Sequence, residues 1–272
     1  MYMRLKDGKR KALTLSYDDG PIQEPKFIEI LDRYGLKGTF NINAGVFVPG
    51  NEKLFYQRMT LDEAKALYIG SGHEVAGHTF LHTALDQLKS DEMINEVLED
   101  RKVLEREFQT PIRGMAYPFG TYNDEVIDIL KKCGICYART TKSTEEFTFP
   151  ENWLEFHPTC RHRDPKLMEL AERFVNGQCR KESDNWLFTV MGHSFEFDHN
   201  NNWEIIEDFA QYVGGKDDIW YATNIEIYDY VKAYENLQTS VDKKIIYNPS
   251  AIDVWVYIDG ETHVIKSGET RL

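Results

Sequence analysis

The sequence predicts an α/β fold in which helices cover a parallel β-sheet, and three observations favour this class. Apolar runs of strand length alternate along the chain with segments whose apolar residues recur at helical spacing, as in βαβ units. The chain has 272 residues, of which 42% are hydrophobic, so it can build the core of one large α/β domain. Its last part lacks helical periodicity and carries only short strand-like runs. The sheet could be open or closed into a barrel.

The expected strands and helices follow one another along most of the chain. Strands are expected at 12–17, 38–44, 73–78, 136–140, 153–159 and 186–192, and residues 114–120 are expected to be a strand that runs into a loop. Helices are expected at 24–34, 60–68, 90–108, 123–132, 165–176, 202–213 and 224–236. The helix at 60–68 opens on Thr60 and Glu63, which have the spacing of a capping box.

The C-terminal end of the chain has a different pattern. The segments "KKIIYNP", "IDVWVYIDG" and "ETHVIKSGET" predict short strands joined by turns. We therefore expect a main domain over residues 1–239 and a small β appendage, residues 240–272, packed on it.

Charge and composition narrow the classes of partner. The net charge is −13 and the pI is about 5.1, which argues against binding to nucleic acid or to anionic membranes. No run approaches the roughly 18 apolar residues of a membrane span. The N-terminal "MYMRLKDGKRK" has no apolar segment, so no signal peptide is expected. The four cysteines are expected to be reduced thiols, and the expected location is cytoplasmic.

The first expected strand ends at two adjacent carboxylates, Asp18 and Asp19, followed by Gly20 and Pro21. Asp-Gly-Pro is common in turns, so an exposed turn is one interpretation. Reactive groups of parallel α/β folds, however, gather at the C-terminal ends of the strands. In the second interpretation the strand holds this pair in a site, where one carboxylate binds a metal and the other takes a proton.

A pair of histidines, His78 and His82, follows another expected strand. On one helical turn this spacing would place both imidazoles on the same face. Two histidines and one strand-end carboxylate make an open three-ligand site. Such a site suits Zn²⁺, or another divalent first-row metal such as Co²⁺, Ni²⁺, Mn²⁺ or Fe²⁺.

Four short motifs resemble those of the polysaccharide deacetylases with NodB homology, carbohydrate esterase family four. They are "SYDDG" (16–20), "HTFLH" (78–82), "AYPFG" (116–120) and "MGH" (191–193), in the family's order and approximate spacing across residues 12–236. The resemblance implies a distorted (β/α) barrel with about seven parallel strands. It also implies the metal-dependent removal of N-acetyl groups from carbohydrate.

The resemblance also implies a role for each matching residue. The implied metal ligands are Asp19, His78 and His82, and the implied catalytic groups are Asp18 as general base, His193 as general acid and Phe119, whose backbone N–H would bind the oxyanion. Elementary chemistry is consistent with these roles, because a carboxylate that is not a ligand can deprotonate water and an imidazole can protonate an amine. Taken alone, a His after an apolar strand, such as His193, is more often a hydrogen-bonded core histidine than a catalytic one.

Candidates for substrate binding are Tyr122, Phe195 and Glu196, since sugars stack on aromatic faces and hydrogen-bond to polar groups. Most other aromatic residues are expected in the core. The segment 157–164, "HPTCRHRD", could line the cleft or form an exposed loop.

Two departures from the family pattern concern the groups around the base and the acid. Ala116 stands where the third motif usually has an Arg that orients the base, and the fourth motif, whose Asp tunes the catalytic His, has no match. Arg139 ends the strand "CYART", and we hypothesise that it takes the place of the missing Arg beside Asp18. The alternative is an Arg139 that bonds a loop carbonyl or a surface acid.

The leading functional hypothesis is a cytoplasmic, metal-dependent N-deacetylase that acts on short N-acetylated carbohydrates. A second hypothesis is an amidohydrolase for a small non-sugar amide or a cyclic ureide on the same fold. A third is a sugar-binding protein with a vestigial site. The intact set of Asp18, Asp19, His78 and His82 favours the deacetylase.

Overall fold

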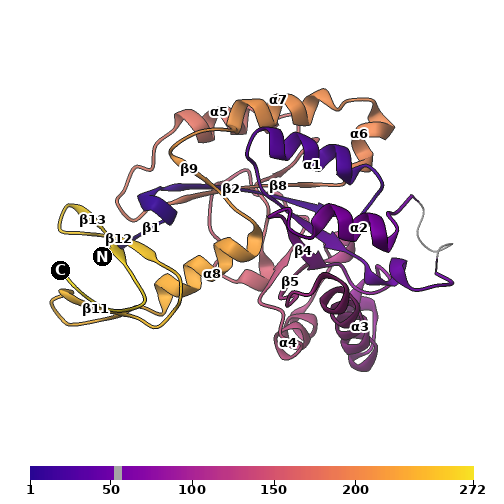
Figure 1. The fold of residues 1–272 in the computed structure, drawn as a ribbon, viewed down its shortest axis with the longest axis horizontal. Coiled ribbons are helices and arrows are strands. Elements are labelled where there is room, and N and C mark those ends of the chain that lie inside the picture. Colours follow the sequence, from indigo (N-terminus) through magenta and orange to yellow (C-terminus); the bar gives the residue numbers. More distant parts are fainter. Residues whose placement is uncertain (52–56) are drawn as a thin grey trace.

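One curved parallel sheet organises the computed structural model, which describes residues 1–51 and 57–272 (Figure 1). The strand order is β6-β5-β4-β3-β2-β8-β7, and β9 also pairs with β2. The strands are β2 (Lys11–Asp18), β3 (Gly38–Ile42), β4 (Glu74–Gly77), β5 (Gly114–Ala116), β6 (Tyr137–Arg139), β7 (Cys160–Arg161), β8 (Trp186–Gly192) and β9 (Ile219–Tyr221). Within the described ranges, β6 and β7 end the seven-strand path and do not pair with each other. The predicted distorted barrel is thus confirmed as a curled half-barrel.

Helices cover the sheet on both faces (Figure 1). They are α1 (Glu24–Arg33), α2 (Leu61–Tyr68), α3 (Ser90–Phe108), α4 (Asp124–Lys132), α5 (Leu167–Asn176), α6 (Phe195–Asn200), α7 (Glu204–Val213) and α8 (Asn224–Glu235). The predicted capping box is present at α2, where Glu63 accepts the Thr60 N–H at 2.8 Å and donates its own N–H to the Thr60 hydroxyl at 3.3 Å.

The central strand β2 places the candidate site. Every residue of β2 is buried, as expected for a strand of a parallel sheet covered on both faces. Its register pairs Tyr17 with Gly192 of β8. The next residue of each strand, Asp18 and His193, therefore leaves the sheet at the same edge.

The prediction of a strand at 153–159 is wrong. Residues Trp153–Glu155 form a short 3₁₀ turn, and the only strand nearby is Cys160–Arg161. Trp153, Leu154 and Phe156 are nevertheless buried in the core. A short apolar run predicts burial reliably, but it does not by itself separate a strand from other buried segments.

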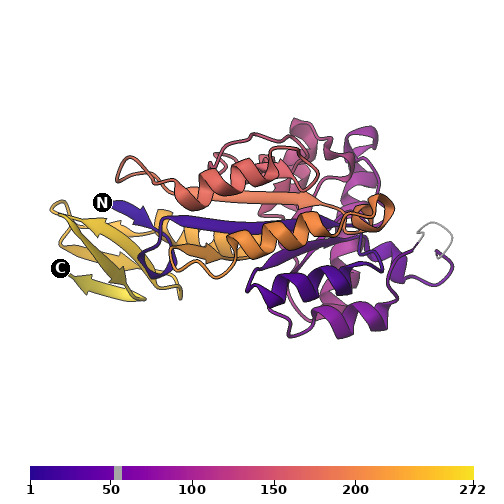
Figure 2. The same ribbon diagram turned by 90° about the horizontal axis from the view of Figure 1, so that it is seen from above.

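The C-terminal strands form two small antiparallel sheets, as the tail pattern predicts. One contains β1 (Tyr2–Arg4), β12 (Val254–Ile258) and β13 (Glu261–Ile265), and the other contains β10 (Gln238–Thr239), β11 (Ile245–Asn248) and β14 (Gly268–Arg271). The first strand of the chain thus joins this end of the molecule, where both termini lie (Figure 2). It is the end opposite α6 in Figure 1.

In the part of the chain that the structure describes, every helix is too short or too polar to cross a membrane. All four cysteines are free thiols.

Candidate active site

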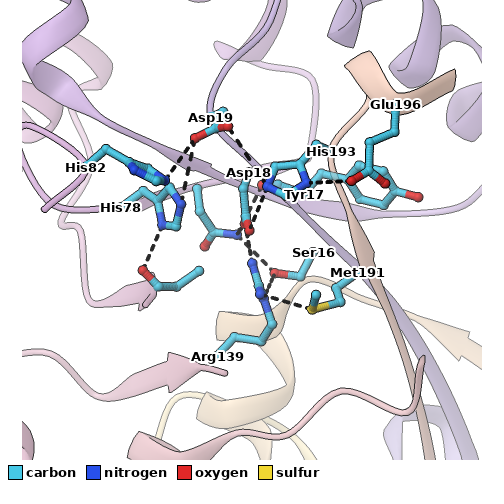
Figure 3. Close-up of polar contacts among 12 residues, drawn as sticks. Ser16, Tyr17, Asp18, Asp19, His78, His82, Arg139, Met191, His193 and Glu196 are labelled. Atoms are coloured by element: carbon cyan, nitrogen blue, oxygen red, sulfur yellow. Dashed lines mark hydrogen bonds and ion pairs between the residues drawn. The ribbon is translucent and has the colours of Figure 1, made fainter. Parts of the chain in front are cut away.

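The carboxyl ends of four parallel strands meet at one edge of the sheet, and each supplies a candidate functional residue (Figure 3). Asp18 is the last residue of β2 and Arg139 is the last of β6, while His78 and His193 directly follow β4 and β8. Parallel strands carry their reactive groups at this end because their loops converge there. The strand-end pattern in the sequence therefore becomes one cluster in space.

The predicted metal ligands lie together. The Asp19 Oδ1 atom is 3.8 Å from His78 Nε2 and 3.6 Å from His82 Nε2. The three ligand atoms all lie within 4.8 Å of one another. Oδ1 is buried and accepts no hydrogen bond from the described residues. A buried carboxylate oxygen without a donor, facing two imidazole nitrogens, fits a divalent cation of the first transition row.

The two histidines share a tight turn instead of the helical turn expected from their spacing. Thr79 and His82 both have a positive φ, 61° and 59°. The turn still brings the rings together, with centroids 4.9 Å apart. The expected helical geometry is wrong, and the expected convergence of the two imidazoles is correct. Positive φ is unfavourable for these residue types, so the turn must be held by its surroundings.

Neighbouring loops hold this turn. The side chain of Asn43 donates to the carbonyls of His78 and Thr79, the latter at 3.0 Å. The N–H of Gly45 donates to the carbonyl of Phe80 at 2.9 Å. A Cβ on Gly45 would lie 2.3 Å from that oxygen, so only glycine permits the approach. The turn that carries His78 and His82, here called the ligand turn, is therefore held in its conformation by hydrogen bonds from other parts of the fold.

Ala116 orients His78 through its backbone. Its carbonyl accepts the His78 Nδ1–H at 2.8 Å, which leaves the lone pair of Nε2 directed at Asp19. Burial lowers the pKa of His78 to about 4, although the negative charges of Asp18 and Asp19 act to raise it. The imidazole is therefore neutral at neutral pH, the form that binds metal.

The candidate base, Asp18, is buried and ion-paired. Its Oδ1 accepts hydrogen bonds from the guanidinium of Arg139 and from Asn41 Nδ2, the latter at 2.9 Å. Burial acts to raise the pKa of Asp18, but Arg139, followed by His78 and His193, lowers it to about 2. Asp18 is thus a carboxylate at neutral pH.

Arg139 is fully buried and lies where the sequence hypothesis places it, beside Asp18. Its Nε donates to Ser16 Oγ at 3.2 Å, and its Nη1 lies 3.1 Å from Met191 Sδ. Of the two alternatives, the bond to a loop carbonyl is also present, since Nη1 donates to the Thr140 carbonyl at 3.2 Å, whereas among the described residues the only acid that pairs with Arg139 is the buried Asp18.

The candidate acid, His193, faces the same space. Its Nε2 is 3.9 Å from Asp18 Oδ2, and its side chain is 23% exposed. Burial acts to lower the pKa of His193, but the hydrogen bond to Glu196 and the charges of Asp18 and Asp19 raise it above the ordinary value. An imidazole with a raised pKa is suited to give up a proton near neutral pH.

A family model described as polysaccharide deacetylase matches residues 5–138. The chain belongs to the polysaccharide deacetylase family. The matched span contains the three candidate metal ligands and Asp18, whereas Arg139 and His193 lie beyond it.

Curated members of this family align with about half of the chain. The protein is 31% identical to chitin deacetylase 1 of Cryptococcus neoformans over 135 residues, which are 49% of this chain and 26% of that protein. It is 24% identical to a chitooligosaccharide deacetylase of a Bradyrhizobium species over 143 residues, 52% of this chain and 60% of that protein. The aligned part thus spans about a quarter to 60% of these relatives.

A solved family member has the same fold. The family 4 carbohydrate esterase from Streptomyces lividans, in complex with acetate, superposes with a TM-score of 0.53 and 16% identity. The superposition covers 78% of this chain and 92% of that chain. At this identity the likeness concerns the fold alone.

Two residues of the site lie outside the family motifs and were not predicted from the sequence. Arg58 donates to Asp19 Oδ2 at 2.9 Å, leaving Oδ1 for the imidazole side. An isolated antiparallel β-bridge between Pro21 and Arg58 brings the loop that carries Arg58 alongside Asp19. Glu24 is buried nearby, and burial, followed by the charge of Asp19, raises its pKa well above the ordinary value. A contact between two loops, such as the one that places Arg58, leaves no periodic pattern in the sequence from which it could be predicted.

Asp100 of α3 was also missed. It accepts the backbone N–H of Ala44 at 2.7 Å and of His78 at 3.0 Å, and so links the helix to the ligand turn. Burial raises the pKa of Asp100 to about 8, against these two hydrogen bonds. A signal did exist, because Asp100 interrupts the buried stripe of Val97 and Leu104 at helical spacing.

The predicted substrate-binding residues lie in three different environments. Phe195 packs against His193, with ring centroids 5.0 Å apart, and is partly exposed. Tyr122 stacks on Tyr117 and donates to Glu155 at 3.1 Å, so its ring belongs to a neighbouring cluster.

Glu196 turns inward and lies between two imidazoles. Burial acts to raise the pKa of Glu196, but its hydrogen bonds to His162 and His193 outweigh this effect and hold that pKa well below the ordinary value.

Phe119 lies at the rim of the metal site. The residue is 66% exposed, and its ring meets the His82 ring edge-on at a centroid distance of 4.8 Å. Its φ of 60° places it in the left-handed region within the turn Pro118–Gly120. That conformation presents the aromatic face to solvent directly beside a candidate ligand.

Proposed function

We propose that the protein is a metal-dependent N-deacetylase that removes the acetyl group from a short N-acetylated carbohydrate. The observation that carries this proposal is the arrangement of Asp18 and His193. An ionised carboxylate and an imidazole of raised pKa lie 3.9 Å apart, and the ligand set of Asp19, His78 and His82 adjoins them. A general base, a general acid and a metal site side by side are what amide hydrolysis requires.

The metal would be held by Asp19, His78 and His82, and two imidazoles with one carboxylate suit Zn²⁺ best. A divalent ion bound there lowers the pKa of water and polarises a carbonyl. Arg58 on Oδ2 of Asp19 would favour binding of the cation through Oδ1.

Asp18 would act as the general base. It takes one proton from water while the water oxygen bonds to the acetyl carbon and the carbonyl electron pair moves to its oxygen. The backbone N–H of Phe119 would donate to that oxyanion. Arg139 holds the Asp18 carboxylate in place and keeps it ionised between turnovers.

His193 would complete the reaction as the general acid. The oxyanion's electron pair re-forms the C=O bond, the C–N bond breaks with its electron pair going to nitrogen, and the nitrogen takes a proton from His193 Nε2. The products are acetic acid, which ionises to acetate, and the amine. Asp18 then releases its proton to solvent and His193 takes one up again. Each proton-transfer group is expected to contribute roughly 10²–10⁴-fold to the rate.

A carbohydrate is the substrate class favoured by the rim and by the relatives. Phe119 and Phe195 present partly exposed aromatic rings beside His82 and His193, where a sugar face can stack. The two relatives described above are named for chitin and for chitooligosaccharides. The cytoplasmic location stays a prediction.

Acetate release tests the proposal. The substrates are N-acetylglucosamine, its short β-linked oligomers, a simple acetamide and a cyclic ureide, each assayed before and after chelation and with metals added back. Release from the sugars that stops on chelation and returns with Zn²⁺ supports the proposal. Turnover of only the acetamide or the ureide would favour the amidohydrolase, and sugar binding without turnover would favour a vestigial site.

A further inference from the structure

Glu196 occupies a position that the family motifs leave unexplained in this chain. It lies on the first turn of α6, three residues after His193. Its Oε1 is 3.3 Å from His193 Nδ1, the nitrogen on the far side of the ring from Asp18. The Glu196 side chain is 15% exposed, so this contact is largely shielded from water.

A second imidazole holds the other oxygen of Glu196. His162 Nε2 lies 3.1 Å from Glu196 Oε2, and His162 Nδ1 lies 3.1 Å from the hydroxyl of Tyr17. His162 and Tyr17 are both buried. Arg163 approaches Oε1 from the surface at 3.8 Å. The carboxylate is therefore fixed at both oxygens.

The backbone makes room for this arrangement. A Cβ on Gly192, the residue before His193, would lie 1.9 Å from His162 Nδ1. The ring of His162 also packs on Phe197 of α6, with centroids 4.2 Å apart. Gly192 and Phe197 thus fix His162 against the same helix that carries Glu196.

The hydrogen-bond directions along this chain of groups are consistent. The Tyr17 hydroxyl lies 3.1 Å from His162 Nδ1 and can donate to it. His162 then carries its proton on Nε2 and donates to Glu196 Oε2. The remaining oxygen, Oε1, accepts from His193 Nδ1–H. The other nitrogen of His193 is left facing Asp18.

We propose that Glu196 is the positioning residue of His193, taking the place of the fourth-motif Asp that this chain lacks, and that His162 and Tyr17 hold Glu196 in place. The proposal rests on the proposed function, because it assigns His193 the proton that the departing amine takes from Nε2. Glu196 does not touch the substrate. It fixes the ring so that the imidazolium delivers its proton from Nε2, and the Nδ1–H tautomer is the form that remains afterwards.

A comparison of two acyl substrates tests the proposal. An N-acetylglucosamine oligomer has an amine leaving group that must be protonated, whereas 4-nitrophenyl acetate has a phenolate that leaves without a proton. With Zn²⁺-loaded protein, Glu196→Gln should lower kcat for the amide about tenfold or more, as part of the ~10²–10⁴-fold effect of a general acid. KM and the rate with the ester should stay within about twofold of wild type. Equal losses on both substrates, or no loss on the amide, would overturn the proposal.

Two further variants sharpen the comparison. Glu204→Gln removes the same charge at an exposed position of α7 and should leave both rates unchanged. Tyr17→Phe keeps the ring that packs on Phe27 and loses only the hydroxyl contact to His162, so it should slow the amide more than the ester. A Tyr17→Phe variant that slows both substrates equally would contradict the role of Tyr17.

Nitrogen-15 NMR of the histidine rings separates this proposal from the proposed function. In the metal-free protein at alkaline pH, His193 should carry its proton on Nδ1, and in Glu196→Ala it should shift toward the Nε2–H form. A tautomer that is Nε2–H in wild type, or that Glu196→Ala does not change, overturns the positioning role even if the wild-type protein releases no acetate. Acetate release that fails while the tautomer behaves as expected contradicts only the proposed function.

Discussion

At Arg139 a guanidinium is fully buried against the carboxylate of Asp18. Removing one partner of a buried ion pair leaves the other charge uncompensated, which costs roughly 3–5 kcal/mol. We therefore expect Arg139→Met to lower the free energy of unfolding by about that amount in urea titrations. In an Asp18→Asn background the same substitution should cost clearly less, because the carboxylate is gone. An equal cost in both backgrounds would contradict the pairing.

Asp100 supports the candidate metal ligand His78 by accepting its backbone N–H. Asp100→Ala leaves the N–H groups of Ala44 and His78 without their acceptor, at a cost of roughly 1–3 kcal/mol each. Loss of a group that orients a ligand typically weakens metal affinity about 10–100-fold. Urea unfolding of the metal-free protein and a Zn²⁺ titration measure the two effects. Glu99→Ala, an exposed position of α3, is the control, and unchanged Zn²⁺ affinity in Asp100→Ala would contradict the supporting role.

Residues at strand ends, including Arg139 as the support of Asp18, could be predicted from the sequence, whereas supporting residues in loops and helices could not. Asp18, Asp19 and Arg139 stand at the ends of apolar runs, and the parallel fold alone brings such positions together. Arg58 reaches Asp19 from a loop, where no period constrains a side chain. Glu196 was expected at the rim, but its contact with His162, 34 positions earlier in the chain, turns it inward. That contact is tertiary and leaves no local pattern.

At the scale of the elements, Glu74 ties the start of β4 to three neighbours. Its carboxyl accepts from Thr39 of β3 at 2.8 Å, from Tyr137 of β6 at 2.6 Å and from the Ile225 N–H of α8 at 2.9 Å. Burial raises the pKa of Glu74 from 4.5 to about 7 against these hydrogen bonds. The folded protein therefore keeps a proton at a pH where the unfolded chain loses it.

This shift predicts a pH dependence of stability. As pH rises from about 4.5 to about 7, the unfolded chain releases the Glu74 proton while the folded protein retains it, so the contribution of this group to stability falls and then levels off. Glu74→Gln cannot ionise and should escape the loss. The difference in unfolding free energy, variant minus wild type, should rise across that window in urea titrations. A difference that stays constant with pH would show that the Glu74 pKa is not raised.

The elements themselves were predictable where the apolar period was long. The helices α3 and α8 and the strands β2 and β8 lie close to their expected ranges. The prediction failed at 153–159, where a short apolar run is buried as a 3₁₀ turn and only Phe156 pairs with a strand, in a single bridge to Arg139 of β6. The turn at 78–82 was also misjudged, because the hydrogen bonds that favour its positive φ values come from Asn43 and neighbouring loops and not from the turn's own sequence.

At the scale of the whole molecule, the N-terminal strand and the C-terminal strands share one core. Tyr230 of α8 links them, since its hydroxyl donates to the Arg4 carbonyl at 2.7 Å and accepts the Trp255 N–H at 2.9 Å. The buried residues of β12 belong to the same apolar cluster as Leu5 and Trp220. We propose that the appendage of residues 240–272 unfolds together with the main domain.

Tyr230→Phe tests this coupling. The loss of the hydroxyl leaves two backbone groups without their partner and should cost roughly 1–3 kcal/mol for each buried group. Thermal unfolding, followed by far-ultraviolet circular dichroism and by tryptophan fluorescence, should show one transition with a lower midpoint for both probes. Two separate transitions, with only one of them shifted, would show that the appendage unfolds on its own.

In the proposed mechanism Asp19, His78 and His82 hold the metal, while Asp18, the neighbouring carboxylate, moves the proton. Asp18→Asn separates the two tasks, and the measurement is acetate release per bound metal from an N-acetylglucosamine oligomer, with metal content determined on the same sample. We expect one equivalent of Zn²⁺, as in wild type, and turnover lower by roughly 10²–10⁴-fold. Full turnover at full metal occupancy, or loss of the metal itself, would contradict this division of roles.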